Sequence, residues 1–183
     1  MSRYTLTNAF ALLVCSTLLF ASFGCESVTA PESSEDFFVV DGPNFVRILS
    51  TSSSGDYEPM AMSGPVSAMV SASEGGTLTN GRVTLEFPAG ALSEDTEITM
   101  EMLNDGTLGV ELSPHGIQFN APVVLSMGLE GTTAEGMAAS LATYYDNPES
   151  GQHEPIPMAA PVDANTTRAL IDHFSKYRDG SNG

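Results

Sequence analysis

Apolar and polar positions alternate along much of this chain, most regularly between residues 75 and 119. Within that stretch every second residue is apolar over residues 83–87, and again over residues 98–102. A period of two is typical of a strand that buries one face. The intervening residues 88–92, Pro-Ala-Gly-Ala-Leu, are too few and too rich in helix breakers to form a helix. We therefore expect two neighbouring β-strands with a turn between them.

The same rhythm continues in short segments as far as residue 177, and Asn80-Gly81 supplies the residue pair typical of a tight hairpin turn. Short strands at close spacing predict an all-β fold, an antiparallel two-sheet β-sandwich, over residues 65–178. The only helical candidate, residues 133–141, contains Gly136, so we expect a loop with at most one turn. Residues 179–183 are expected to form a disordered tail. The expected strands span residues 67–73, 76–79, 82–87, 96–102, 109–113, 122–129, 140–145, 153–158 and 167–174.

The apolar face of each expected strand should point into the space between the two sheets. Because side chains alternate across a strand, the buried positions can be read from the period-two pattern. We expect much of the core to be formed by Val83, Leu85, Phe87, Ile98, Met100, Leu112, Phe119, Val123, Leu125, Ile171 and Phe174.

Residues 1–24 have the pattern of a secretory signal peptide. Arg3 is their only charged residue, and the uncharged, largely apolar run after it extends to Gly24. This run is short for a membrane span, and it ends in small residues and a cysteine, where a signal peptidase would act. The alternative is an uncleaved membrane anchor.

Cys25 is the only cysteine expected in the exported chain, because Cys15 lies within the leader. No intramolecular disulfide can then form, and an exposed thiol in a secreted protein needs another explanation. The residues that end at Cys25 resemble the lipobox of bacterial lipoproteins, in which a small residue precedes the lipid-bearing cysteine. Lipidation of Cys25 would anchor the protein to the cell membrane or the outer membrane. The same residues would also suit an ordinary signal peptidase, which would leave the protein periplasmic or extracellular.

The chain is strongly acidic, with a formal net charge of −17. Removing Arg3 with the leader takes this to −18, since residues 1–24 contain no Asp or Glu. A polyanion would be repelled, so nucleic acid is excluded as a partner. We interpret the charge as a solvated surface that keeps an exported protein soluble; an acidic binding face is the alternative.

Residues 25–64 have the composition of a flexible acidic tether, rich in Ser, Glu, Asp and Pro. Such sequence cannot bury enough apolar surface to offset the entropy lost on ordering. Two apolar islands interrupt it, at residues 37–40 and 45–49. Either these islands dock as short strands on the edge of the domain, or they belong to a disordered linker.

Several motifs between residues 66 and 177 occur in an order that resembles a known family. They are Gly75-Gly76-Thr77-Leu78, Val83-Thr84-Leu85, Pro88-Ala89-Gly90-Ala91-Leu92, Ser113-Pro114-His115-Gly116 with Phe119, Pro122-Val123, and His173-Phe174-Ser175-Lys176-Tyr177. Together they are similar to the ZU-five domain, a β-sandwich shared by zonula occludens proteins, Unc-five netrin receptors and ankyrins. The resemblance implies a non-enzymatic interaction module, since such domains act as scaffolds and adaptors in animals. This chain departs from that context in having an export signal and no partner domain.

The resemblance also implies one chemical alternative, at His173-Phe174-Ser175. In relatives of the PIDD type the same tripeptide is a self-cleavage site, where the serine hydroxyl attacks the preceding carbonyl. Cleavage between Phe174 and Ser175 would need a strained peptide bond, a base such as His173 and a donor for the developing oxyanion. The competing interpretation is that Phe174 fills the core while its two neighbours cap adjacent strands.

Other chemistries have weaker support. Ser113 and His115 could belong to a hydrolase, but there is no GxSxG motif and no acid can be singled out. A module that binds envelope carbohydrate is a further alternative; the chain has no Trp, and Tyr144 is one of few rings that could stack on a sugar. His115, His153 and His173 are far apart and lack metal-ligand spacing. We therefore expect no metal and no cofactor, and a binding partner that is an unidentified protein or another envelope component.

Overall fold

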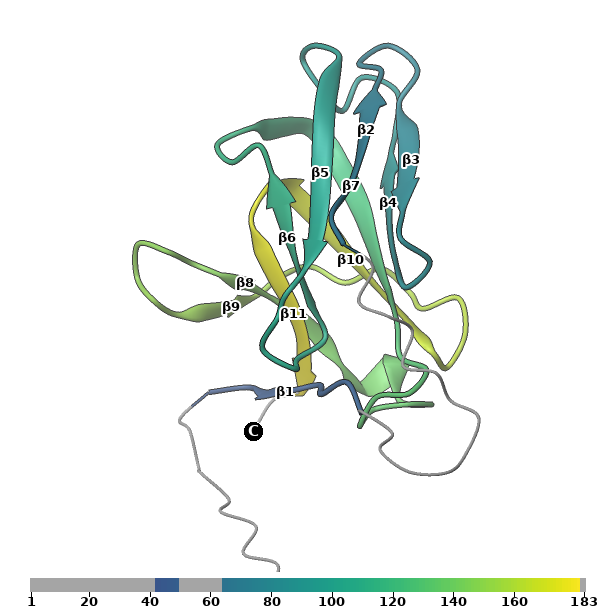
Figure 1. Cartoon of the computed structure of the whole chain (residues 1–183), viewed down its shortest axis with the longest axis vertical. Coiled ribbons are helices and arrows are strands. Elements are labelled where there is room, and N and C mark those ends of the chain that lie inside the picture. The colour runs from purple at the N-terminus through teal and green to yellow at the C-terminus, as the bar shows by residue number, and fades with distance from the viewer. Residues whose placement is uncertain (1–41, 50–63, 182–183) are drawn as a thin grey trace, which may run out of the picture. The chain divides into compact units, whose positions relative to one another are not determined.

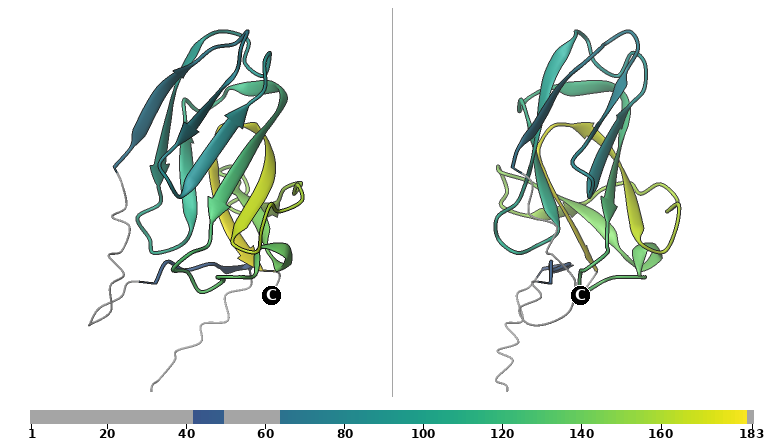
Figure 2. Two further views of the ribbon diagram at one scale, coloured as in Figure 1. Left: turned by 90° about the vertical axis from the view of Figure 1, so that its right-hand side faces the viewer. Right: turned by 45° about the vertical axis from the view of Figure 1, so that its right-hand side comes forward.

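The computed structural model describes residues 42–49 and 64–181, which form two antiparallel β-sheets packed against each other (Figures 1 and 2). The larger sheet has the strand order β2-β5-β6-β11-β8-β9, and β1 also pairs with β11. The smaller sheet has the order β10-β7-β4-β3. This arrangement confirms the predicted all-β sandwich. The elements are β1 (Asn44–Phe45), β2 (Val66–Val70), β3 (Gly76–Thr79), β4 (Val83–Phe87), β5 (Thr96–Met102), β6 (Gly109–Ser113), β7 (Gln118–Gly128), the 3-10 helix η1 (Ala138–Ser140), β8 (Ala142–Asp146), β9 (His153–Pro155), β10 (Thr166–His173) and β11 (Lys176–Ser181).

Each of the nine expected strand segments overlaps an observed strand, and β3, β5 and β6 have the expected bounds. Strand β7 begins earlier than expected, at Gln118, so that Pro122 lies inside it. The pairing of β7 with β10 is irregular around Pro122: Ile171 pairs with Val123, but His173 pairs with Gln118. A proline is tolerated in a strand at such an irregularity because it has no N–H for the ladder. The helical candidate reduces to the single turn of η1, as expected.

A tight turn joins β3 and β4 as predicted, but its centre lies one residue later than expected, at Gly81-Arg82, because Thr79 pairs with Thr84 and the Asn80 N–H donates to the Val83 carbonyl. The Asn80 side-chain oxygen accepts hydrogen bonds from the backbone N–H groups of Arg82 and Val83, at 3.0 and 2.7 Å. Gly81 has φ of +91°, in the left-handed region that glycine adopts without strain. The local sequence alone therefore explains this hairpin.

The two most regular strands, β4 and β5, are not neighbours, which corrects the expectation from their pattern. Strand β4 pairs with β3 and β7, whereas β5 pairs with β2 and β6. Residues 88–95 carry the chain from one sheet to the other, and the Ala91 and Leu92 side chains among them are buried. A period of two indicates which face of a strand is buried, and it does not identify the strand beside it.

The core lies between the inner faces of the two sheets. Ten of the eleven predicted core residues are buried there, and Phe119 is half-buried at the edge of the cluster. Its ring packs edge-on against the rings of Phe87 and Phe174, with centroid distances of 6.0 and 4.7 Å. The predicted core residues are therefore confirmed, except that Phe119 is less buried than expected.

Residues 176–181 form β11, which lies inside the larger sheet between β6 and β8. The expected disordered tail is therefore wrong for residues 179–181, of which Asp179 and Gly180 are buried. Residues 176–179 do alternate between the two faces of a strand. Three of the four are charged, so the period-two hydrophobic pattern that predicts a strand is absent. Residues 182 and 183 lie outside the described part of the chain.

The domain also includes residues 42–49, which the composition had assigned to the tether. Strand β1 pairs with Gly180 and Ser181 of β11, and the Val46 side chain is buried in the core. The apolar island at residues 45–49 thus docks on the domain, the first of the two alternatives. The island at 37–40, Cys25 and the leader lie outside the described residues. Within the described ranges, no helix has the length and hydrophobicity needed to cross a bilayer.

Replacing Phe87 by alanine should lower the free energy of unfolding by about 2 to 5 kcal/mol, because the ring fills the space between the sheets. Chemical denaturation of the purified chain measures this change. Met69→Ala is the matched control, since Met69 is 67% exposed, and it should change stability by less than about 0.5 kcal/mol. Equal unfolding midpoints for the two variants would show that Phe87 is not a core residue.

Candidate functional site

The tripeptide His173-Phe174-Ser175 lies where the chain crosses from β10 in the smaller sheet to β11 in the larger one. The Phe174 ring is buried in the core, with its centroid 4.7 Å from that of Phe119. The Ser175 carbonyl accepts a hydrogen bond from the Leu112 N–H at 2.9 Å, which joins the crossing to β6. Phe174 therefore fills the core, as the competing structural interpretation expects. The Phe174–Ser175 peptide bond, which self-cleavage would break, lies in the connection between β10 and β11.

The His173 imidazole lies beside the Asp172 carboxylate and close to the rings of Tyr145 and Tyr177. Its Nδ1 lies 2.6 Å from a carboxylate oxygen of Asp172, and its ring packs edge-on against Tyr145 at 4.7 Å. The Tyr177 hydroxyl donates a hydrogen bond to the His173 carbonyl at 2.8 Å. Burial, together with the Asp172 carboxylate, raises the pKa of Tyr177, so this hydroxyl remains a neutral donor. Among the described residues, no hydrogen bond joins the His173 ring to the Ser175 hydroxyl.

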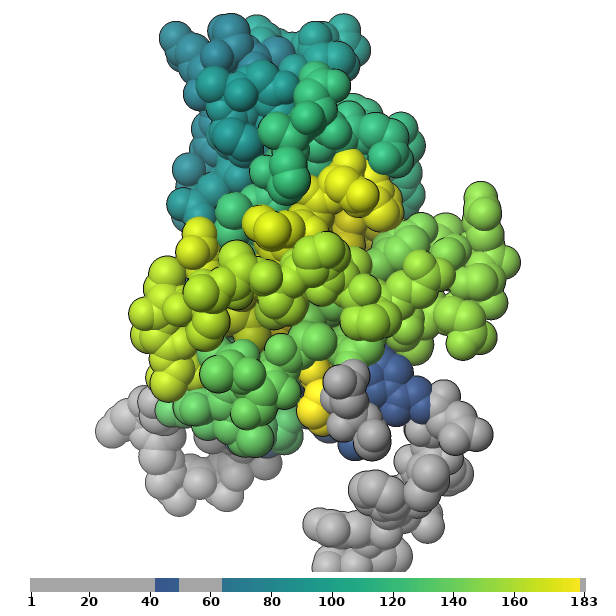
Figure 3. All heavy atoms as spheres, turned by 180° about the vertical axis from the view of Figure 1, so that it is seen from behind, coloured from purple at the N-terminus to yellow at the C-terminus, as the bar shows by residue number. Residues whose placement is uncertain are grey.

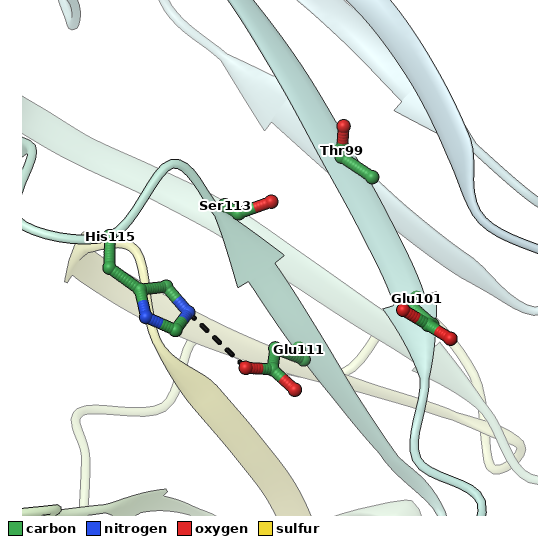
Figure 4. Close-up of a pocket in the computed structure, with 5 residues that line it drawn as sticks. All are labelled: Thr99, Glu101, Glu111, Ser113 and His115. Atoms are coloured by element: carbon green, nitrogen blue, oxygen red, sulfur yellow. Dashed lines mark ion pairs between the residues drawn. The ribbon is translucent and has the colours of Figure 1, made fainter.

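A second candidate site is a hollow on the outer face of the larger sheet, with a volume of about 470 Å³ (Figure 4). Thr99 and Glu101 on β5, Glu111 and Ser113 on β6, and His115 in the following loop line it. Thr99 is paired directly opposite Ser113, and Glu101 directly opposite Glu111. All the lining groups can form hydrogen bonds, and paired strands hold four of the five.

The two glutamates of the hollow differ in their surroundings. Glu111 lies 3.4 Å from His115 Nε2 and 3.4 Å from the Lys176 ammonium group. Glu101 forms no ion pair with any described residue, and the residue directly across the ladder from it is Glu111, another carboxylate. Like charges in directly opposite positions destabilise a sheet. The hollow would therefore favour a ligand that brings positive charge or hydrogen-bond donors to Glu101.

The sequence did not single out an acid that could accompany Ser113 and His115 in a hydrolase. In the structure, Glu111 is the carboxylate beside His115. The imidazole Nε2 faces Glu111, while the Ser113 hydroxyl points away from the ring, toward β5 (Figure 4). In the described part of the chain no hydrogen bond joins Ser113 to His115. A nucleophilic serine needs contact with its base, so this arrangement fits a binding hollow better than an acyl-transfer site.

The Arg178 side chain, on the larger sheet, contacts both β8 and the β1 segment. Its Nε donates to a carboxylate oxygen of Asp146 at 2.8 Å, and its guanidinium lies over the Phe45 ring at 5.4 Å. Phe45 in turn packs edge-on against Tyr144, which is only 3% exposed. The carbohydrate alternative therefore finds no exposed stacking ring at Tyr144.

The three histidines lie in separate places, each beside one carboxylate. His115 is next to Glu111, while His153 lies 2.8 Å from Asp146 and His173 lies beside Asp172. Across residues 42–49 and 64–181, no group of three or more His, Cys, Asp or Glu side chains is placed to hold a metal ion.

Asp179 is a buried carboxylate that the sequence analysis did not identify. It lies between the sheets, where it accepts a hydrogen bond from the Thr143 hydroxyl of β8 at 2.6 Å and another from the Thr167 hydroxyl of β10. Burial raises the pKa of Asp179 to about 6, because two hydroxyl donors compensate only part of the lost hydration. Its position directly after Tyr177-Arg178 in a period-two pattern was the signal that could have revealed it.

A scan against models of known protein families finds no match to this chain. A search of curated proteins also finds no match. The ZU-five resemblance therefore depends only on the order and spacing of the motifs.

The Asp179→Asn variant should be more stable than the wild type, by a margin that grows with pH. The folded state holds its proton up to a pKa of about 6, whereas in the unfolded chain Asp ionises near pH 4. The wild type therefore loses stability as pH rises through this window, and the side-chain amide of the variant cannot ionise. We expect the difference to grow by about 2 kcal/mol between about pH 4 and about pH 8, measured by denaturant unfolding. Glu94→Gln, at an exposed carboxylate, is the control and should show no such trend. A constant difference for Asp179→Asn would contradict the raised pKa.

Proposed function

We propose that this chain is an exported, lipid-anchored protein of the cell envelope whose β-sandwich is a non-enzymatic interaction module of the ZU-five type. The interaction surface is the outer face of the larger sheet. The observation that carries this proposal is the hollow between β5 and β6, lined by two hydroxyls, two carboxylates and an imidazole. Strand pairing fixes the backbone positions of four of the five lining residues before any ligand binds, which lowers the entropy lost on association.

The charge of the chain supports a protein partner on this face. Glu101 is exposed and forms no ion pair among the described residues, and the whole chain has a formal net charge of −17. A cationic partner would be attracted to such a surface, and nucleic acid or another polyanion would be repelled. This role requires no cofactor, because charge and strand geometry alone supply the recognition.

The leader and Cys25 support membrane attachment. The leader has the charge and length of an export signal, and Cys25 follows a small residue at its end. A single cysteine in an exported chain has no partner for a disulfide, and lipidation would account for it. A single domain anchored in this way would present its sheet face to other envelope proteins.

The anchoring is tested by intact mass and membrane fractionation of the chain, expressed with its own leader in a bacterial host. We expect a chain that begins at Cys25, carries the mass of a diacylglyceryl group and usually an acyl chain, and fractionates with membranes. Cys25→Ser should abolish both the added mass and the membrane attachment. Cys15→Ser is the matched control and should change neither, because Cys15 lies in the leader. An unmodified chain that begins at Cys25 would mean simple secretion, and retention of Met1 would mean an uncleaved anchor.

A second candidate function is self-cleavage between Phe174 and Ser175. It is favoured by the contact of His173 Nδ1 with Asp172, because a carboxylate beside an imidazole fixes the orientation of the ring, as in hydrolase triads. Attack of the Ser175 hydroxyl oxygen on the Phe174 carbonyl would move the acyl group from nitrogen to oxygen and leave a free amine on Ser175. Water would then hydrolyse the ester, leaving a carboxylate on Phe174 and restoring the Ser175 hydroxyl.

The same mass measurement, made under denaturing conditions, tests self-cleavage. Denaturation is needed because ladder hydrogen bonds to β6 and β8 would retain a cut β11 in the folded protein. We expect an uncut chain, with identical masses for the wild type and Ser175→Ala apart from the substituted oxygen atom. A wild-type chain that ends at Phe174, together with an intact Ser175→Ala chain, would overturn the non-enzymatic assignment.

A further inference from the structure

Strand β2 is the end strand of the larger sheet, and among the described strands it pairs only with β5. The Gly75 N–H donates to the Ser71 carbonyl, so the backbone groups of Ser71 point away from β5. Backbone groups alternate in direction along a strand, so those of Ser67 and Met69 point to the same free side. Strand β2 therefore presents four unused donors and acceptors at the edge of the sheet, within the described part of the chain.

Two contacts on the other side of β2 support this assignment. The Ala72 N–H donates to a carboxylate oxygen of Asp95, which follows the same alternation toward β5. The hydroxyls of Ser67 and Thr99 approach to 2.7 Å across the ladder. Side chains come this close where the two backbones of an antiparallel pair do not bond to each other.

Among the described residues, the other sheet edges have protection that β2 lacks. Strand β9 is three residues long and ends in Pro155, and β3 is a four-residue strand that begins with Gly76. Residues 157–159 cover the edge of β10, and the Ala159 N–H donates to the Arg168 carbonyl. This part of the chain lies on the face shown in Figure 3, in yellow-green. Strand β2 contains no charge, proline or glycine, and its Met69 side chain is 67% exposed. Such an open edge is a template for a further strand.

The outer face beside β2 indicates the charge of that strand. Glu97 lies on β5 directly across the ladder from Met69, and Glu101 follows on the same face. Neither carboxylate forms an ion pair with a described residue. The side chains of a strand added to β2 would stand roughly 10 Å from β5, two strand spacings away. A lysine or arginine can span this distance by laying its aliphatic stem over Met69 and its charge beside Glu97.

We propose that the free edge of β2 binds an extended, lysine- or arginine-rich segment of a partner protein by strand addition, an inference that rests on the proposed interaction role. The partner's backbone pairs with Ser67 and Met69, and its alternate basic side chains reach Glu97 and Glu101. A second copy of this chain fits the edge less well, because each copy carries a formal net charge of −17. Strand pairing supplies affinity, and the carboxylates select a cationic partner.

Residue-resolved hydrogen exchange on the full chain in mild detergent tests this, with a short peptide of alternating lysine and valine as the probe. Without peptide, the Ser67 and Met69 amides should exchange faster than those of Ala68 and Val70, which face β5 and serve as the internal control. Saturating peptide should slow exchange at Ser67 and Met69 by at least about tenfold and leave Ala68 and Val70 unchanged. Methylating alternate backbone nitrogens of the peptide should weaken binding by at least about tenfold, because the ladder cannot form.

The charge requirement is tested by a titration with the double variant Glu97→Gln and Glu101→Gln. Its affinity for the peptide should fall about tenfold or more, while Glu149→Gln, at an exposed carboxylate in the turn after β8, leaves the affinity unchanged. If methylated and unmethylated peptides bound equally, strand addition would be overturned and the acidic face would remain an interaction surface. If neither peptide bound, both the strand addition and a cationic partner for this face would be overturned. Protection of Ser67 and Met69 before peptide is added would also overturn the inference. It would assign the edge to a second copy if it depended on concentration, and to another segment of this chain if it did not.

Discussion

The pairing of β11 with its neighbours is the interaction on which the larger sheet depends. Strand β11 bonds to β6 on one side and to β8 on the other, and β1 pairs with its end. Without residues 176–181 the sheet would separate into β2-β5-β6 and β8-β9, and the core would lose Tyr177, a fully buried side chain. These contacts join positions far apart in the chain, so forming them closes long loops at a cost in conformational entropy.

Placing β11 in the centre of the larger sheet buries the Asp179 carboxylate, which is energetically unfavourable. The carboxylate lies between the sheets and is hydrogen-bonded by Thr143 of the larger sheet and Thr167 of the smaller one. A shift of β11 by one residue would turn Asp179 outward and bring Arg178 into the core, separating its guanidinium from Asp146. The polar contacts on both faces of β11 thus favour one register, even though the buried carboxylate is unfavourable in itself.

The candidate sites are consequences of the same arrangement. The crossing from β10 to β11 places the Phe174 ring in the core, and the buried ring fixes the corner at which the Phe174–Ser175 peptide bond lies. On the outer face of the larger sheet, β5 supplies Thr99 and Glu101 to the hollow and also pairs with the edge strand β2, which has no other partner among the described strands. One acidic sheet face thus adjoins both a hollow and an edge that no described strand pairs with, and the proposed recognition of an extended cationic segment depends on this arrangement.

The local pattern of residues determined most of the strands and nearly all of the core. Alternation identifies the buried face of a strand, and Asn80-Gly81 specifies a turn within four residues, so neither needs information from distant parts of the chain. The burial of Phe174 could also be predicted, because it is a large apolar ring at the end of an alternating strand. The shift in register after Ile171, which precedes it, could not.

Only the tertiary structure decided which strands are neighbours. Strands β4 and β5 have the same pattern whether they share a sheet or face each other across the core, and the polar segment at residues 176–181 becomes a central strand only because β6 and β8 bond to it. The same holds for the hollow and the open edge, whose residues form no distinctive motif in the sequence. A ladder partner is set by long-range contacts and by the burial of whole sheets, and these are properties that no short stretch of sequence contains.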